Sequence, residues 1–150
     1  MTTITHATIV MERTYNAAPA RVFHAWQDRK ARERWQAPDE TIQIRYEDAD
    51  FRQGGRDVAR CIEADGAEFL ATVYYLEIRR DQRIVFTEAV AQRNANVSAA
   101  LISVELSPVN AGTLQRVTMQ IASFDESGME KGYEHGWSMA LDNLAKEFEQ

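Results

Sequence analysis

The stretch that decides the fold is GMEKGYEHGWSMALDNLAKEFEQ, residues 128–150. Its large apolar side chains recur in steps of three or four residues, which is the spacing of one face of an α-helix. These side chains belong to Met129, Tyr133, Trp137, Leu141, Leu144 and Phe148. Because such a stripe must be buried against another layer, we expect a long terminal helix that packs on a sheet.

Three glycines recur at four-residue spacing in this stretch. Gly128 marks the entrance of the predicted helix, whereas Gly132 and Gly136 lie inside it. An interior glycine costs about 1 kcal/mol relative to alanine, so a compensating reason is expected. One interpretation is that the two glycines help to shape a cavity between the helix and a curved sheet. The competing interpretation is that they only permit close approach of a strand or loop.

The rest of the chain predicts one strand, two short helices and then six more strands. A strand is expected at 7–15, and Asn16 and Pro19 predict the start of a first helix, which a second helix at 29–35 follows. The later strands fall at 41–47, at 56–80 as two strands joined by the Asp65–Gly66 turn, and at 82–90, 98–107 and 112–123. Successive hairpins predict an antiparallel sheet with the helices gathered on one face, an α+β fold in a single domain spanning 1–150.

Composition narrows the classes of function. The net charge of −6 argues against general nucleic-acid binding, which needs a basic surface. The basic cluster at 28–34 is interpreted as a solvated helix face. No apolar run is long enough for a membrane span, and the start of the chain lacks the pattern of a secretory signal, so a cytoplasmic location is expected.

The titratable side chains give no clear catalytic or metal-binding motif. The three histidines, His6, His24 and His135, lack metal-ligand spacing, and we expect them on the surface. Cys61 is the only cysteine and is interpreted as a small apolar strand residue. Gly54 and Gly55 match no phosphate-binding pattern, so they are interpreted as a turn that leads into a strand. No metal or cofactor is therefore predicted.

Alternation along the strands indicates which side chains share a face with the helix. Phe86 and Glu88 share one face of their strand, and Met119 lies on an apolar face of another. If the faces carrying Arg60 and Tyr74 also point inward, polar groups enter a mainly apolar space and Arg60 can pair with Glu88. The competing interpretation is that these polar side chains reach solvent at the strand ends.

Four stretches together resemble a known family. They are APARVFHAWQDRKARERWQAP, DFRQGGR, YLEIRRDQRIVFTEA, and GTLQRVTMQ followed by the terminal helix with its Gly136–Trp137 pair. In this order they resemble the START-like superfamily, and within it the group related to the C-terminal domain of the activator of the heat-shock protein 90 ATPase. The chain departs from that pattern at Gln36 and Ala37, where the family often has an aromatic residue and a glycine.

The resemblance implies a helix-grip: a curved antiparallel sheet of about six to seven strands wrapped around the C-terminal helix, enclosing a cavity. The predicted function is non-catalytic binding of a small hydrophobic or amphipathic molecule there. The predicted ligand-binding residues are Trp137, Tyr133, Phe86, Met119, Tyr74, Arg60, Glu88 and Trp35. Two alternatives stay open, a protein-interaction module linked to a chaperone and a cyclase- or hydrolase-like enzyme that uses the same cavity.

The state of assembly is left open by the sequence. Val73, Tyr75 and Val85 are assigned to the outer face of the sheet, where they are compatible with a homodimer. Scattered apolar side chains on the surface of a monomer fit the same pattern.

Overall fold

The computed structural model describes residues 3–125 and 128–149. In chain order the strands and helices have the following bounds: β1 Thr5–Tyr15, α1 Pro19–Gln27, α2 Arg29–Trp35, β2 Gln43–Asp48, β3 Arg56–Ile62, β4 Glu68–Arg79, β5 Arg83–Gln92, β6 Ala95–Val109, β7 Gly112–Ser123, α3 Met129–Leu144 and the 3₁₀ turn η1 Ala145–Phe148. This is the predicted order of elements, and the predicted α+β class is confirmed.

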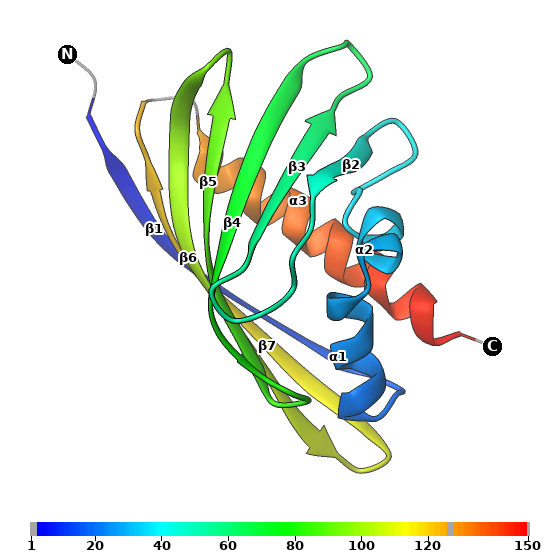
Figure 1. Ribbon diagram of the computed structural model, residues 1–150. Coiled ribbons are helices and arrows are strands. Elements are labelled where there is room, and N and C mark those ends of the chain that lie inside the picture. The colour runs from blue at the N-terminus through cyan, green and yellow to red at the C-terminus, as the bar shows by residue number, and fades with distance from the viewer. Residues whose placement is uncertain (1–2, 126–127, 150) are drawn as a thin grey trace.

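The strands form one antiparallel sheet of seven in the order β1-β7-β6-β5-β4-β3-β2. From β2 to β7, each strand pairs with the next strand in the sequence. Strand β1 lies at the other edge of the sheet and pairs with β7, from Thr5↔Ser123 to Tyr15↔Thr113. The sheet is strongly curved, and α3 crosses its inner face with α1 and α2 beside its C-terminal half (Figure 1). The curvature follows from the right-handed twist of long strands.

The helix starts are set by local chemistry, with one departure from expectation. Pro19 opens α1 as predicted, but the N-cap is Ala18, whose side chain makes no capping bond, so Asn16 does not cap the helix. The Asp28 side chain caps α2 by accepting from the Lys30 amide. Gly128 is the N-cap of α3 with a left-handed φ of 78°, which confirms it as the helix entrance.

The two glycines inside α3 are not required for close packing. A Cβ placed on Gly132 would meet nothing within 4 Å, and one on Gly136 would make only an ordinary contact with Pro38 Cγ at 3.9 Å. The close approach occurs instead in the loop before β3, where a Cβ on Gly55 would lie 2.2 Å from the Asp50 carbonyl oxygen. The predicted turn at Gly54–Gly55 is confirmed, and Gly54 has a φ of 84°.

The core lies between the inner face of the sheet and the three helices. It contains the predicted inward rows of β5, β6 and β7, among them Phe86 and Met119. Trp26, Trp35 and Trp137 meet in one aromatic group, in which the Trp26 and Trp137 rings stack at 5.9 Å between centroids. This group fixes α1, α2 and α3 to one another.

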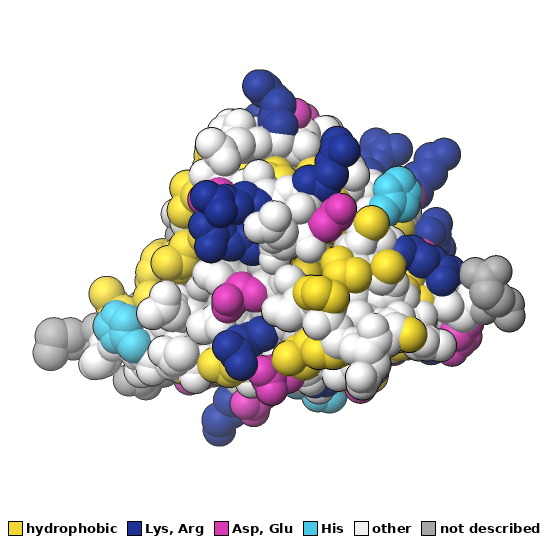
Figure 2. All heavy atoms as spheres, turned by 90° about the horizontal axis from the view of Figure 1, so that it is seen from below, with side chains coloured by type: hydrophobic (Ala, Val, Ile, Leu, Met, Phe, Trp, Pro, Cys, Tyr) yellow, Lys and Arg dark blue, Asp and Glu magenta, His cyan; other side chains and the backbone are white. Residues whose placement is uncertain are grey.

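The face of the molecule seen from below carries both basic and acidic side chains, with apolar areas between them (Figure 2). None of the helices among the described residues is long and apolar enough to cross a membrane. His6, His24 and His135 are exposed, as predicted.

Candidate functional site

Helix α3 covers only part of the inner face of the sheet. It packs chiefly against β1 and β7 and against α2. Inward-pointing side chains on the other half of the sheet, from β2 to β5, therefore stay partly exposed. We call this set the open inner face; it comprises Ile44, Tyr46, Ala59, Cys61, Phe69, Ala71, Val73 and Glu88. It joins the core at Phe69 and Val73, which pack against the buried cluster from the partly exposed side.

The register of the strands explains why these side chains share one face. Val73 lies between Asp57 on β3 and Glu88 on β5, and Ala71 lies between Ala59 and Val90. Asp57 and Val90 are both buried on the helix side. Because paired residues point to the same face of a sheet, Val73, Ala71 and Glu88 also point inward.

Glu88 is the polar group of this face. The Tyr133 hydroxyl of α3 donates to Glu88 Oε1 at 2.7 Å. Burial raises the pKa of Glu88, while the Tyr133 hydrogen bond acts in the opposite direction. Burial likewise raises the pKa of Tyr133, and the adjacent Glu88 charge raises it further. Tyr133 is therefore a neutral donor to a carboxylate that lies in mainly apolar surroundings.

Two further polar side chains, Ser98 and Glu130, have a buried oxygen without a hydrogen-bond partner among the described residues. The Ser98 hydroxyl is close enough to the Tyr133 phenol to lower its pKa, yet Ser98 Oγ is buried with no partner at hydrogen-bonding geometry among the described residues. Glu130 Oε2 is also buried without such a partner, and Glu130 precedes Tyr133 by three residues, on the same side of α3. Buried polar atoms without partners are uncommon in folded proteins, so this end of α3 has unused hydrogen-bonding capacity.

A buried ion pair supports the opposite edge of the open inner face. Arg32 and Asp57 are each 2% exposed, and Arg32 Nη2 lies 3.1 Å from Asp57 Oδ2. Arg32 also donates to the Tyr46 hydroxyl at 3.1 Å and to the Trp26 carbonyl, and the Tyr75 hydroxyl donates to Asp57. Arg32 and Asp57 each have several hydrogen-bond partners. A buried ion pair is tolerated when its charged groups are hydrogen-bonded in this way.

Arg32 thus departs from the predicted role of its segment. The basic cluster at 28–34 was interpreted as a solvated helix face, but α2 turns Arg32 into the core. The sequence signal for a buried Arg32 is Asp57, a charged residue at an inward position of a strand. A buried carboxylate requires a cation beside it, and that cation can come from a distant part of the sequence. Gln115 is a second residue that the sequence did not single out; it accepts from Trp26 Nε1 at 2.8 Å.

Five predicted site residues lie on the helix side of the sheet, and their role in ligand binding stays a prediction. Tyr133, Phe86, Met119 and Trp35 are buried, and Trp137 is partly exposed on α3. Glu88 joins them on the open inner face. Among the predicted site residues that point inward, Tyr133 and Glu88 form a hydrogen bond with each other, and Trp137 keeps part of its side chain exposed.

Arg60 and Tyr74 lie on the outer face, contrary to the inward placement considered for them. Arg60 pairs with Glu47 at 2.9 Å and with Glu68 at 3.2 Å, so the predicted Arg60–Glu88 pair is wrong. Tyr74 is 49% exposed. The two residues alternate with Ala59 and Val73, which take the inward positions.

The outer-face assignments also need correction. Val73 and Tyr75 point inward, and Tyr75 is 5% exposed, so neither contributes to an outer apolar surface. A β-bulge between Tyr75 and Glu77 adds Leu76 to the outer side.

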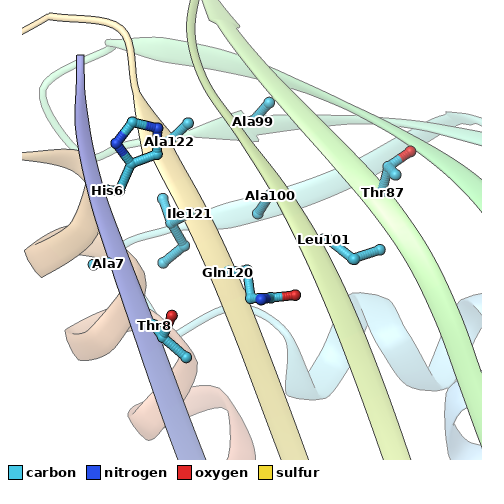
Figure 3. A pocket seen from close by; sticks show the side chains of 10 residues that line it. All are labelled: His6, Ala7, Thr8, Thr87, Ala99, Ala100, Leu101, Gln120, Ile121 and Ala122. Carbon is cyan, nitrogen blue, oxygen red and sulfur yellow. The ribbon is translucent and has the colours of Figure 1, made fainter.

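The two most clearly formed hollows along the described residues both lie away from α3, which lines neither of them. The first hollow, of about 420 Å³, lies on the outer face of the sheet over β1, β7, β6 and β5. The small side chains of Ala99 and Ala122 leave space there between larger neighbours (Figure 3). The second, of about 790 Å³, lies at the tips of the β3–β4 and β5–β6 hairpins and includes Phe69 of the open inner face. Neither hollow lies between the sheet and α3, so the predicted cavity there stays a prediction.

The other candidates for chemistry are a cysteine nucleophile and groups of metal ligands. Burial raises the pKa of Cys61 to about 11, so its thiol is a poor nucleophile at neutral pH. No group of three potential metal ligands occurs within residues 3–125 and 128–149.

Comparison with known proteins gives consistent relationships. Residues 16–149 match the family model described as Activator of Hsp90 ATPase homolog 1-like protein. The crystal structure of the Mll3558 protein from Rhizobium loti is 37% identical, with a TM-score of 0.86, covering 97% of this chain and 99% of that one. An uncharacterized protein from Rhizobium leguminosarum is 27% identical, with a TM-score of 0.87 and coverages of 98% and 97%.

A more distant relative shares the fold alone. The solution structure of an AHSA1-like protein from Aeromonas hydrophila is 20% identical, with a TM-score of 0.70 and coverages of 94% and 91%. Comparison with curated proteins returned no match. On the extent of the family match and the identity to the Rhizobium loti protein, this chain belongs to the Activator of Hsp90 ATPase homolog 1-like family.

Proposed function

We propose that the open inner face binds a small hydrophobic or amphipathic molecule, without catalysis. The observation that carries this proposal is the incomplete cover that α3 gives to the sheet. Apolar inward side chains such as Phe69, Ala71 and Val73 stay partly exposed, although their neighbours in register, Val90 among them, are buried. Burial of such surface by a ligand contributes about 25 cal/mol per Å² before the costs of association.

The surroundings of this face suit an amphipathic ligand. Trp137 of α3 is partly exposed beside the core, which gives a broad apolar contact. Glu88 and Tyr133 add one polar point, and a few polar groups in an apolar site orient a ligand. Phe86, Met119 and Trp35 support the site from the core beneath it.

The test compares two matched variants. Ala71→Phe fills the open inner face, whereas Ala89→Phe places the same ring on the outer face, because Ala89 pairs with the outward Thr72. Binding of 1-decanol is measured by isothermal titration calorimetry for both variants and the wild type. We expect Ala71→Phe to weaken binding at least about tenfold and Ala89→Phe to leave it unchanged.

Native mass spectrometry of the purified protein gives an independent check. A co-purified small molecule that is retained by the wild type and absent from Ala71→Phe supports the proposal. Decanol binding that both phenylalanine variants preserve would contradict it, as would the absence of any binding to the wild type.

A further inference from the structure

The Glu88 carboxylate has no cationic partner among the described residues. Within residues 3–125 and 128–149 no ion pair includes Glu88, and its one hydrogen-bond donor there is the Tyr133 hydroxyl. By contrast, Asp57, which is buried on the inner face, is paired with Arg32 at 3.1 Å. A carboxylate removed from water without a counter-charge is costly, so Glu88 is an unusual feature of this interior.

The atoms around Glu88 are also acceptors or neutral donors. Ser98 is fully buried and its Oγ has no hydrogen-bond partner among the described residues, so it can accept a hydrogen bond from a ligand near the Tyr133 phenol. Glu130 Oε2, three residues before Tyr133 on α3, is a second buried acceptor without a partner in the described part of the chain. Glu88 and Ser98 thus offer oxygen acceptors beside the Tyr133 phenol, and no ion pair among the described residues brings a cation to Glu88.

We propose that this end recognises a protonated primary amine, whose ammonium group bonds to Glu88 and Ser98 while its apolar chain lies along Ala71 and Val73. This inference rests on the proposed function and names the chemical class of the ligand. An ammonium group has three donors and no acceptor, which matches a site that offers acceptors. It also supplies a positive charge, which no ion pair in the described part of the chain brings to Glu88.

The position of Glu88 favours this geometry. It neighbours Val73 across the β4–β5 pair and Ala100 across the β5–β6 pair, so it lies where the open inner face meets the covered half of the sheet. A ligand chain that lies on Val73 and Ala71 therefore ends at Glu88, and the Tyr133 side chain holds that carboxylate in place.

The test compares three ten-carbon probes by isothermal titration calorimetry at neutral pH: decylammonium chloride, 1-decanol and sodium decanoate. A charge-assisted hydrogen bond in a partly buried site predicts that decylammonium binds at least about tenfold more tightly than decanol. Decanoate is expected to bind more weakly than decanol, because its charge repels Glu88.

The variant that isolates the site is Glu88→Gln, which keeps an oxygen acceptor for Tyr133 and removes the charge. We expect it to abolish the preference for decylammonium over decanol, so that the two probes bind with similar affinity. Glu134→Gln is the matched control, since Glu134 is exposed on α3 and its loss changes the net charge by the same amount. That control is expected to keep the preference.

The outcomes separate the two proposals. Decanol binding that Ala71→Phe removes, without any preference for decylammonium, leaves the proposed function standing and overturns the amine inference. A preference that survives Glu88→Gln, or that Glu134→Gln also removes, overturns it as well, because the attraction then comes from the overall negative charge. Failure of all probes overturns both proposals. If Glu88→Gln does not fold, the order of the three probes on the wild type decides.

Discussion

The Tyr133 hydroxyl on α3 donates a 2.7 Å hydrogen bond to the Glu88 carboxylate on β5, across the boundary between the covered and open halves of the inner face. This contact ties the N-terminal half of α3 to the centre of the sheet. The C-terminal half is held by other bonds, including one from the Tyr15 hydroxyl to the Leu141 carbonyl at 2.7 Å. The two ends of the helix are therefore anchored independently.

Removal of the phenol hydroxyl tests the first anchor. Tyr133→Phe leaves the partly buried Glu88 carboxylate without the hydrogen bond from Tyr133, so we expect the free energy of unfolding to fall by about 1–3 kcal/mol. Tyr74→Phe is the control, because Tyr74 is exposed on the outer face and is expected to change stability by less than about 0.5 kcal/mol. Urea denaturation measures both; equal effects of the two substitutions would contradict the assigned role.

The raised pKa of Glu88 predicts a specific pH dependence of stability. The Glu88 carboxyl binds its proton more readily in the folded chain than in the unfolded chain. Protonated Glu88 therefore favours folding at low pH. This stabilisation is lost as the pH rises above the ordinary pKa of 4.5 and through the raised pKa of the folded chain. Glu88→Gln does not titrate. Its stability relative to wild type should therefore increase with pH over this window, and a difference that is independent of pH would refute the assignment.

The buried ion pair predicts a large effect from a single substitution. Arg32→Met leaves Asp57 buried without its cation, and we expect a loss of about 3–5 kcal/mol. Arg60→Met removes an arginine from pairs that lie on the outer surface and is expected to cost less than about 1 kcal/mol. Chemical denaturation of both variants distinguishes a buried pair from a surface pair; similar small losses would show that Arg32 reaches solvent.

Alanine substitutions at Gly132 and Gly128 of the terminal stretch are expected to change the stability of the protein in opposite directions. Gly132→Ala adds a methyl group in open space within a helix, so it should stabilise the protein by about 0.5–1 kcal/mol. Gly128→Ala places a side chain at a left-handed φ and should destabilise it by about 1–2 kcal/mol. Thermal unfolding checks both signs, and a destabilising Gly132→Ala would revive the close-packing interpretation.

The sequence predicted the elements well because their signals are local. Alternation in β5 to β7 placed Phe86 and Met119 correctly, and the helical spacing of α3 placed Tyr133 and Trp137. The turn at Gly66, which has a φ of 90°, fixed the β3–β4 hairpin. Each of these features depends on residues that are close in the chain.

The orientation of β3 and β4 was beyond that reasoning. Both faces of β4 carry apolar side chains, so alternation does not show whether Val73 or Tyr74 points inward. In β3 the buried positions include the charged Asp57, and its neutralisation depends on Arg32, which is 25 residues away. The incomplete cover by α3 is likewise a property of how distant elements pack.

The most direct test of the central proposal is an NMR measurement of intermolecular contacts between 1-decanol and the methyl groups of the protein. If a ligand occupies the open inner face, nuclear Overhauser effects connect the decanol chain to Ala71 and Val73. Contacts to Ala99 and Leu101 in the outer-face hollow instead, or no contacts at saturating decanol, would contradict the proposal.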